Sequence, residues 1–434
     1  MSRNQMNRRS FLRRSAGTAA TAMAAPCVIP ASALGREGAV APSEKITAGF
    51  IGTGSHGIHR NLRMYLRQPD ARVLSVCDVD GSRMRDAKKM VDEKYKNSDC
   101  GASRDFRDIL ARDDIDTVMI STPDHWHVLM SVMAVKAGKD VQCEKPTLTI
   151  DEGKILVKTV RRHKKVFQTS TEDRSLAVYH KMAELVRNGR IGKLQRIEVI
   201  LPKQPSRPGK TTVEPVPPDF DWEMWLGPAP DAPYTPDGVH FNFRWLWAYS
   251  GGIICDWGTH LFDTAQWAND TERSGPVEID GKGTFWESGL YDTVKDYDVT
   301  YKYANGVVMT CKPGTPSIKF IGTDGFIGNQ GWNSQRIQAS SDEVLEPVTG
   351  PNAVKLFTNP AGEHRNFLDC VKSRHDPYFP VDIGHRVSTI CHLANISIKL
   401  GRKLRWDPDK EGFPDDAEAT AMMSRGMREP WSLS

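Results

Sequence analysis

The sequence predicts an α/β protein with two domains. Its N-terminal part is expected to form a doubly wound parallel sheet, followed by an α+β domain with an open-faced, largely antiparallel sheet. Strand-like apolar runs alternate with helical patterns up to residue 172, and a glycine-rich turn joins the first strand to the first helix. Beyond residue 173 strand patterns follow one another directly. A chain of 434 residues, 39% hydrophobic and 26% charged, suits two folded domains and excludes a disordered or fibrous protein.

The first 33 residues are typical of an export signal. Arg8 and Arg9 precede a run of small and apolar residues at 16–29, and Ala31-Ser32-Ala33 fits a cleavage site. This pattern resembles a twin-arginine signal, which is an address and not an anchor. We therefore expect a periplasmic protein, with residues 34–44 as a linker. The alternative is a disordered basic N-terminus.

Charge and cysteine usage narrow the class of protein. Five of the 58 basic residues lie in the first 33 positions, which leaves 53 against 54 acidic residues in the remainder. A nearly neutral body gives no electrostatic reason to expect nucleic acid. No run of about 18 strongly apolar residues predicts a membrane span. The eight cysteines show no C-x-x-C pair, which favours buried free thiols over a disulfide framework or a zinc site.

Elements of the N-terminal domain follow from hydrophobic period and length. Short apolar runs predict strands, and the longer amphipathic stretches between them predict helices. The strands are expected over residues 46–51, 71–77, 117–121, 140–143 and 166–169. The helices are expected over about ten residues ending at 66, then over 82–94, 105–111, 127–137 and 150–163. Strand, helix and strand at this spacing form a parallel sheet.

Gly52-Thr53-Gly54-Ser55-His56-Gly57 follows the first strand and opens the first helix. Gly52 permits the tight turn, Gly54 lets the backbone approach a pyrophosphate, and Gly57 lets the helix pack on the strand. The free N–H groups at the helix N-terminus favour phosphate oxygens. The loop therefore predicts a Rossmann dinucleotide-binding domain over residues 45–172, and the alternative is a glycine-rich turn without a ligand.

An acidic residue follows the second strand at the position that selects the dinucleotide. Asp78 is placed to accept hydrogen bonds from the adenosine ribose diol, and its charge would repel a 2′-phosphate. Asp80 also favours NAD over NADP, whereas Arg83 is the one nearby residue that could accept a 2′-phosphate. The cofactor is expected to be NAD in preference to NADP.

Two further motifs lie at the carboxyl ends of strands, where ligands bind in open α/β sheets. They are Ser121-Thr122-Pro123-Asp124-His125-Trp126-His127 and Glu144-Lys145-Pro146. Together with the glycine loop they resemble the glucose–fructose oxidoreductase, inositol dehydrogenase and rhizopine-catabolism (Gfo/Idh/MocA) family, over residues 45–431. The resemblance implies an NAD-dependent oxidoreductase with Thr122, Pro123, Glu144 and Lys145 at the cofactor. His127 is a further cofactor candidate, although a structural role for His125 or His127 is an equal alternative.

Residues 251–263 resemble the substrate-side helix of the same family. Asp256, His260 and Asp263 are spaced i, i+4 and i+7, so one helix would place all three on one face. Taken alone, such a stripe is either a hydrogen-bonded structural cluster or, less favoured, a metal site. We predict no metal site, because neighbouring residues offer no convincing further ligands.

The resemblance implies hydride transfer between a carbinol carbon and the nicotinamide. The alcohol loses a proton as the hydride leaves, so a base belongs beside it, and His260 is the candidate. Asp256 is expected to orient the imidazole, and Lys145 to hold the reacting oxygen, with Pro146 restricting the backbone of Lys145. Lys145, Asp256 and His260 are thus predicted to be catalytic and, with Arg174, to bind the substrate; Arg174 would otherwise be an interdomain ion pair.

The C-terminal domain is predicted over residues 173–405, with a tail from 406 to 434 packed on the body. Strands are expected at 194–201, 277–286, 298–303, 307–312, 317–320 and 326–328, and helices at 363–374 and 386–400. Asn305-Gly306 is a hairpin signal. The resemblance implies an open sheet face free for a partner subunit, hence a homodimer or homotetramer. The aromatic clusters near residues 222–225 and 243–247 suit either sugar stacking or core packing.

These observations predict an exported oxidoreductase for a sugar, polyol or glycoside. Because free NAD is not expected to be recycled outside the cytoplasm, the cofactor should stay bound and return to its starting state in each turnover. A second reading is a redox-neutral NAD-dependent glycosidase or lyase that works through a transient keto-sugar. A third is a non-catalytic carbohydrate-binding protein, since a fold does not fix a function.

Overall fold

The computed structural model describes residues 40–433, so the export signal predicted over residues 1–33 and Cys27 lie outside the described residues. The chain divides into two units, residues 1–45 and residues 46–434. In the described end of the first unit, Pro42–Glu44 forms a single 3₁₀ turn within the predicted linker. The second unit carries both sheets and is treated from here on.

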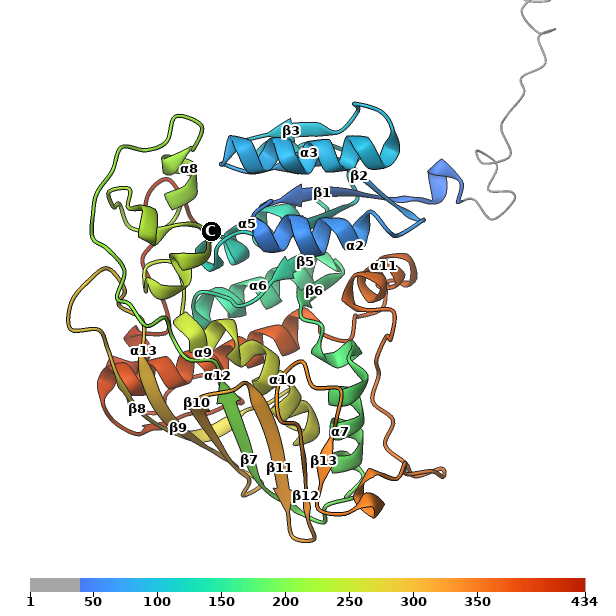
Figure 1. Ribbon diagram of the computed structural model, residues 1–434, viewed down its shortest axis with the longest axis vertical. Coiled ribbons are helices and arrows are strands. Elements are labelled where there is room, and N and C mark those ends of the chain that lie inside the picture. The colour runs from blue at the N-terminus through green and yellow to red at the C-terminus, as the bar shows by residue number, and fades with distance from the viewer. Residues whose placement is uncertain (1–39, 434) are drawn as a thin grey trace, which may run out of the picture. The chain divides into compact units, whose positions relative to one another are not determined.

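Within residues 46–433, one sheet has six parallel strands in the order β3-β2-β1-β4-β5-β6 (Figure 1). They are β1 (Ile46–Ile51), β2 (Ala71–Cys77), β3 (Gly101–Ser103), β4 (Thr117–Ile120), β5 (Asp140–Glu144) and β6 (Phe167–Ser170). Successive side chains of β4 enter different buried clusters: Val118 and Ile120 pack in one, and Met119 in the other. The sheet is therefore covered on both faces, as the predicted doubly wound fold requires.

The helices of this domain stand where the sequence predicts them, with small shifts. They are a π-helical turn (Gly57–Leu62) continued by α2 (Arg63–Tyr65), then α3 (Gly81–Tyr95), α4 (Phe106–Leu110), α5 (Asp124–Lys136) and α6 (Ile150–His163). Helix α5 starts three residues earlier than predicted, because the polar motif after Pro123 already forms its first turn. Strand β3 was not predicted, since three residues are too few to show a period.

The second sheet within the described residues has eight strands in the order β13-β12-β11-β7-β10-β9-β8-β14, and in it β10 runs parallel to β7. The strands are β7 (Leu194–Leu201), β8 (Pro276–Thr284), β9 (Asp296–Tyr303), β10 (Val308–Pro313), β11 (Ser317–Gly322), β12 (Phe326–Gly328), β13 (Gln338–Ala339) and β14 (Leu404–Arg405). The Asn305-Gly306 hairpin is confirmed: β9 and β10 are antiparallel, and Gly306 has φ +87°.

Helices cover one face of the second sheet (Figure 1). They include α7 (Ala177–Arg187), α9 (Gly252–Asp256), α10 (Gly258–Ala268) and α12 (Val381–Leu400). The remaining helices of this half are α8 (Trp222–Leu226), α11 (Glu363–Ser373) and α13 (Ala417–Ala421). In β7, Ile197 and Val199 are fully buried, whereas Arg196 and Glu198 on the opposite face are more exposed. This alternation fits a sheet with a single covered face.

The helix predicted over residues 251–263 is present, with an irregularity at one residue. Helix α9 ends at Asp256 and α10 starts at Gly258, and Trp257 between them keeps right-handed helical angles (φ −94°, ψ −28°). Gly258 allows close packing here, since a Cβ there would lie 2.9 Å from the Phe262 ring and 3.1 Å from Cys391 Sγ.

The C-terminal tail packs back on the first domain. The Trp431 ring lies 4.8 Å from the Trp126 ring, centroid to centroid, and Arg428 donates to the carbonyl of Gly227. Seven cysteines of the described residues are buried free thiols, as the scattered spacing predicted. In the same residues, no helix combines the length and apolarity needed to cross a membrane.

Candidate active site

A cavity of about 640 Å³ opens at the carboxyl ends of β1, β4 and β5. Its lining comes from the glycine loop, the ends of β2, β4 and β5, helices α9 and α10, and the loop before β13. All the predicted cofactor residues except Thr53 lie in this lining: Gly52, Gly54, Ser55, His56, Gly57, Asp78, Thr122, Pro123, His127, Glu144 and Lys145. The cavity therefore joins motifs far apart in the sequence.

The glycine loop leaves room only where a ligand is expected. Gly52 has φ +87°, and a Cβ there would lie 2.6 Å from the backbone of Ser121. A Cβ on Gly57 would lie 2.4 Å from the carbonyl oxygen of Gly52. At Gly54 the one neighbour of a Cβ is the end of the flexible Arg83 side chain, 3.0 Å away. Gly52 and Gly57 thus have the packing roles predicted from the motif.

Asp78 is held at the end of β2 by the glycine loop itself. Its Oδ2 accepts from the backbone N of Thr53 at 2.6 Å, and its Oδ1 accepts from the backbone N of Asp80 at 2.9 Å. Burial raises the pKa of Asp78, and these backbone hydrogen bonds oppose the shift. Thr53 is itself buried, so it positions Asp78 and does not line the cavity.

Lys145 projects from the end of β5 onto Asp256. Its Nζ donates to the Asp256 carbonyl at 2.8 Å and to Asp256 Oδ1 at 2.9 Å. Arg244 Nε lies 3.1 Å from Asp256 Oδ2. Burial alone would raise the pKa of Asp256, but Arg244 and Lys145 outweigh it and hold this pKa well below its usual range. Two cations thus share one carboxylate, and the charge of Glu144 also acts on both of them.

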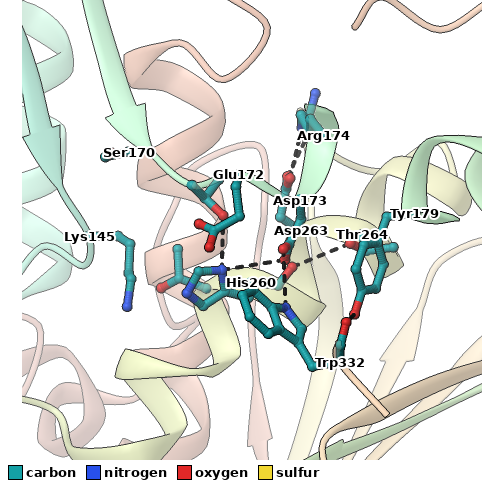
Figure 2. A network of polar contacts seen from close by, with 12 residues as sticks. Lys145, Ser170, Glu172, Asp173, Arg174, Tyr179, His260, Asp263, Thr264 and Trp332 are labelled. Atoms are coloured by element: carbon teal, nitrogen blue, oxygen red, sulfur yellow. Dashed lines mark hydrogen bonds and ion pairs between the residues drawn. The ribbon is translucent and has the colours of Figure 1, made fainter. Parts of the chain in front are cut away.

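His260 lies in the first turn of α10, with its ring at the cavity wall (Figure 2). Its Nδ1 is 3.0 Å from Thr171 Oγ1 and 3.4 Å from Asp173 Oδ2. Asp173 is fully buried, and its Oδ1 accepts from Trp332 Nε1 at 3.2 Å. Burial would lower the pKa of His260, but Asp173 outweighs burial and raises it. A neutral imidazole with its proton on Nδ1 would direct that proton to Thr171 and Asp173 and keep the lone pair on Nε2.

The predicted role of Asp256 toward His260 is wrong. The Asp256 carboxylate meets Lys145 and Arg244, while Thr171 and Asp173 lie at Nδ1 of the imidazole. Sequence spacing pointed to Asp256 because side chains four residues apart in a helix share a face. Spacing does not show which partner each side chain takes. Asp173 comes instead from the segment after β6, on the other side of the imidazole ring.

The two histidines of the second motif are tied to the backbone. Both ring nitrogens of His127 lie 2.8 Å from carbonyl oxygens, those of Pro146 and Thr122. His125 Nε2 is 2.9 Å from the Trp225 carbonyl oxygen, and burial lowers the pKa of His125 to about 4. His127 touches the cavity but joins two strand-end loops with its polar atoms, which supports the structural alternative for both residues.

Arg174 lies away from the cavity lining. Its guanidinium donates to both carboxylate oxygens of Asp263, at 2.8 and 2.6 Å, and to Glu272 at 2.6 Å. Only 3% of the residue is exposed. Arg174 therefore forms an ion pair, but its partners Asp263 and Glu272 belong to the same predicted domain, so the pair does not join two domains. The Asp256, His260 and Asp263 side chains each have a different partner. Among the described residues no three acidic, histidine or cysteine side chains are grouped to hold a metal ion.

Glu144 joins the glycine loop to the Glu-Lys-Pro motif. His56 Nε2 lies 3.0 Å from Glu144 Oε1, which also accepts from Asn61 Nδ2 at 3.0 Å. The neighbouring Glu144 carboxylate, against a smaller effect of burial, raises the pKa of His56. His56 and Glu144 therefore meet across the cavity edge, as expected of two cofactor-side residues.

Sequence reasoning missed several residues around His260. Thr171, Glu172 and Asp173 follow β6, so the rule that ligands gather at strand ends was signal enough to find them. Arg244 and Trp332 carry no such signal. Each reaches the cavity from a long loop whose path depends on the packing of the whole second domain.

The residues present fit a dinucleotide. Gly54 places backbone without a side chain at the cavity wall, the Asp78 carboxylate lines the same cavity, and so do Lys145 and His260. The fold and the site together define an NAD-binding oxidoreductase of the Rossmann type.

The chain belongs to the Gfo/Idh/MocA oxidoreductase family. The family model for its NAD-binding Rossmann fold matches residues 46–171, and that for its C-terminal alpha/beta domain matches residues 206–433. The resemblance stated from the motifs is thereby confirmed, as are the fold class and the NAD-binding domain.

Curated relatives match part of the chain. An uncharacterized oxidoreductase, YrbE, from Bacillus subtilis is 24% identical over 270 residues, which is 61% of this chain and 66% of that relative. A glycosyl hydrolase family 109 protein from Shewanella sp. (strain ANA-3) is 35% identical over 160 residues, 34% of this chain and 35% of that relative. The chain thus spans less than two thirds of the length of either.

Solved structures share the fold at low identity. The WlbA dehydrogenase from Chromobacterium violaceum, in complex with NADH and UDP-GlcNAcA, has a TM-score of 0.65 at 17% identity, covering 86% of this chain and 97% of that one. An aldose-aldose oxidoreductase from Caulobacter crescentus has a TM-score of 0.64 at 15% identity, covering 83% and 99%. At these identities the likeness concerns the fold.

Proposed function

We propose that this chain is an exported NAD-dependent oxidoreductase that acts on a CH–OH group of a sugar, polyol or glycoside. The observation that carries the proposal is the meeting of Lys145 and His260 at one end of the cavity, opposite the dinucleotide loop. An ammonium and an imidazole with a free nitrogen are the two groups that oxidation of an alcohol needs beside the reacting oxygen.

His260 acts as the base in this scheme. Nδ1 faces Asp173 and Thr171, so Nε2 is left to take the hydroxyl proton of the substrate. Asp173 stabilises the imidazolium that results, because a buried carboxylate favours a neighbouring positive charge. NAD, when bound, supplies the acceptor for the hydride of the carbinol carbon.

Lys145 acts on the oxygen. Asp256 fixes its ammonium through two hydrogen bonds, which leaves the third N–H free to donate to the substrate oxygen. Asp256 and Glu144 keep Lys145 protonated, so its ammonium stabilises an oxygen that is losing its proton. Lys145 does not need to move for this.

A redox-neutral glycosidase or lyase is the second candidate. The relatives that carry the name glycosyl hydrolase family 109 match this chain mainly over a stretch of 131–178 residues, at 29–35% identity. Transient oxidation of a ring hydroxyl would acidify a neighbouring C–H and allow a glycosidic substituent to leave. The same Lys145 and His260 would serve the first step in both candidates.

Export and assembly are part of the proposal. The twin-arginine pattern of residues 1–33 supports a periplasmic location and a tightly held cofactor, which is loaded before export and returns to its starting state in each turnover. The polar face of the eight-stranded sheet that no helix covers supports a homodimer or homotetramer.

Mass spectrometry of small molecules released from freshly purified, denatured protein tests the cofactor, and NAD is the expected product. A panel of sugars and glycosides, followed by NADH absorbance and by glycoside cleavage, then separates the two candidates, since steady NADH accumulation excludes the redox-neutral cycle. His260→Ala should abolish turnover with nucleotide still bound; unchanged turnover would refute the assignment.

A further inference from the structure

A second carboxylate faces the reacting end of the cavity, and the chemistry above gives it no task. Glu172 follows β6 and lines the cavity, with 16% of its side chain exposed. In Figure 2, Lys145, Glu172 and Trp332 are grouped around the His260 ring, whereas Arg174 lies away from it. The charge of Glu172 also contributes to the raised pKa of His260, after burial, Asp173 and Lys145.

Glu172 is only partly engaged by the protein. Over residues 40–433, its carboxylate makes one ion pair, with Arg60 at 3.3 Å, and accepts no hydrogen bond. Arg60 is bound more closely by Glu363, at 2.7 Å, whose other oxygen accepts from Ser170 at 3.1 Å. Glu363 therefore satisfies Arg60, and Glu172 keeps acceptor sites that open into the cavity.

The cations of the cavity are all matched. Each lysine and arginine of the lining forms an ion pair with a carboxylate: Arg60 with Glu363, Arg83 with Asp80, Arg104 with Asp219, and both Lys145 and Arg244 with Asp256. Around the reacting end, the lining cations Lys145, Arg244 and Arg60 are met by the lining carboxylates Asp256, Glu172 and Glu144. This end thus has no spare cation for a substrate carboxylate or phosphate, and Glu172 would repel one.

The remaining wall beside His260 is aromatic. The Trp332 ring lies 5.6 Å from the His260 ring and 5.5 Å from the Trp257 ring, centroid to centroid, and both tryptophans line the cavity. Indole rings and a hydroxyl-accepting carboxylate in one cavity suit a ring that has C–H groups on one side and hydroxyls on its edge.

We propose that this end of the cavity selects a neutral polyhydroxylated ring, with Glu172 accepting hydrogen bonds from hydroxyls next to the reacting carbon and Trp332 packing on the ring. The inference rests on the proposed oxidoreductase function and narrows its substrate to uncharged sugars and glycosides. Glu172 is a substrate-binding residue here, and the proton remains with His260.

Matched pairs of neutral and acidic sugars test the inference. D-glucose with D-glucuronate, D-galactose with D-galacturonate, and the corresponding methyl glycosides are compared by kcat/KM with wild-type protein. The neutral member should be favoured by about tenfold or more, because like charges at close range are costly. Preference for the acidic members would overturn the inference while leaving the oxidoreductase function intact.

Glu172→Gln gives the second arm. It keeps the size of the side chain but removes the charge, so KM for a neutral sugar should rise about tenfold with kcat little changed, and the penalty on the uronates should shrink. Glu272→Gln is the matched control: it removes a carboxylate of the Arg174 cluster, lies outside the cavity lining, and should lower the melting temperature without changing selectivity. Equal selectivity in Glu172→Gln and wild type would overturn the inference.

Binding replaces turnover as the readout if no panel member is turned over. Tryptophan fluorescence, followed during titration with each sugar, reports occupancy next to Trp332, and Trp332→Phe identifies its share of the signal. Neutral members should quench more tightly than uronates, and failure of every neutral member to bind would overturn the inference. Loss of the proposed function is distinct, since it appears as protein without released nucleotide and as turnover unaffected by His260→Ala.

Discussion

Helix α10 carries two charged clusters one turn apart that use the same kinds of residues to different ends. His260 pairs with Asp173 at the cavity wall, and Asp263, three residues later, pairs with Arg174. In the second cluster every polar atom of the guanidinium and carboxylate faces protein, and neither residue exceeds 3% exposure. In the first, the imidazole keeps one nitrogen toward the cavity. Residue type alone does not separate a site from a structural ion pair, whereas an unsatisfied atom at a cavity does.

The largest expected effect breaks the first cluster. His260→Gln removes the nitrogen that takes the substrate proton, so kcat should fall about 10²–10⁴-fold, while the free energy of unfolding changes little. Steady-state kinetics and urea denaturation measure the two. A large loss of stability with activity retained per folded molecule would reverse the roles assigned to the two clusters.

Arg174→Met breaks the second cluster. It leaves Asp263 and Glu272 without their cation, and removing one partner of a buried pair costs about 3–5 kcal/mol. In the wild-type protein, burial raises the pKa of Asp263 to about 6, although Arg174 opposes this shift. Without Arg174 the pKa of Asp263 should rise further. The free energy of unfolding is expected to fall by that amount, and the kcat of the folded fraction to stay near wild type. A fall in kcat without loss of stability would instead place Arg174 at the substrate.

Asp173→Asn sharpens the comparison by testing how the imidazole is held. Loss of a hydrogen bond to a charged group costs about 1.5–3 kcal/mol, so kcat/KM should fall roughly 10- to 150-fold. Asp173 raises the pKa of His260. The base must be unprotonated, so activity rises as the pH passes the pKa of His260. In the variant, the rising part of the pH–activity profile should therefore move to lower pH. A pH profile that keeps its position would show that Asp173 does not act on His260.

Trp332→Phe has the smallest expected effect. It keeps the aromatic wall and removes only the Nε1–H that donates to Asp173 at 3.2 Å. Loss of a neutral donor costs about 0.5–1.5 kcal/mol, so kcat/KM should fall roughly 2- to 10-fold, with the pH limb shifted slightly to higher pH, because Asp173 then pulls more strongly on the imidazole. A loss as large as that of Asp173→Asn would mean that Trp332 itself positions the imidazole.

Much of the first domain was predictable, because its signals are local. A strand, a glycine loop and an acidic residue after the next strand lie within a few dozen residues, and parallel strands bring their carboxyl ends to one edge. That reasoning placed Gly52, Asp78, Lys145 and Glu144 at the cavity, and it extends to Glu172 and Asp173 when applied to the end of β6.

The sequence by itself predicted the dinucleotide loop and the two side chains, Lys145 and His260, that line the same cavity. Only the tertiary structure decided their partners, since it placed Asp256 against Lys145 and Arg244 and brought Asp173 to the imidazole and Trp332 to Asp173. Helical spacing predicts which side chains are neighbours within one element. A side chain between elements can contact groups from several of them. Those contacts depend on how the elements pack, which no local pattern records.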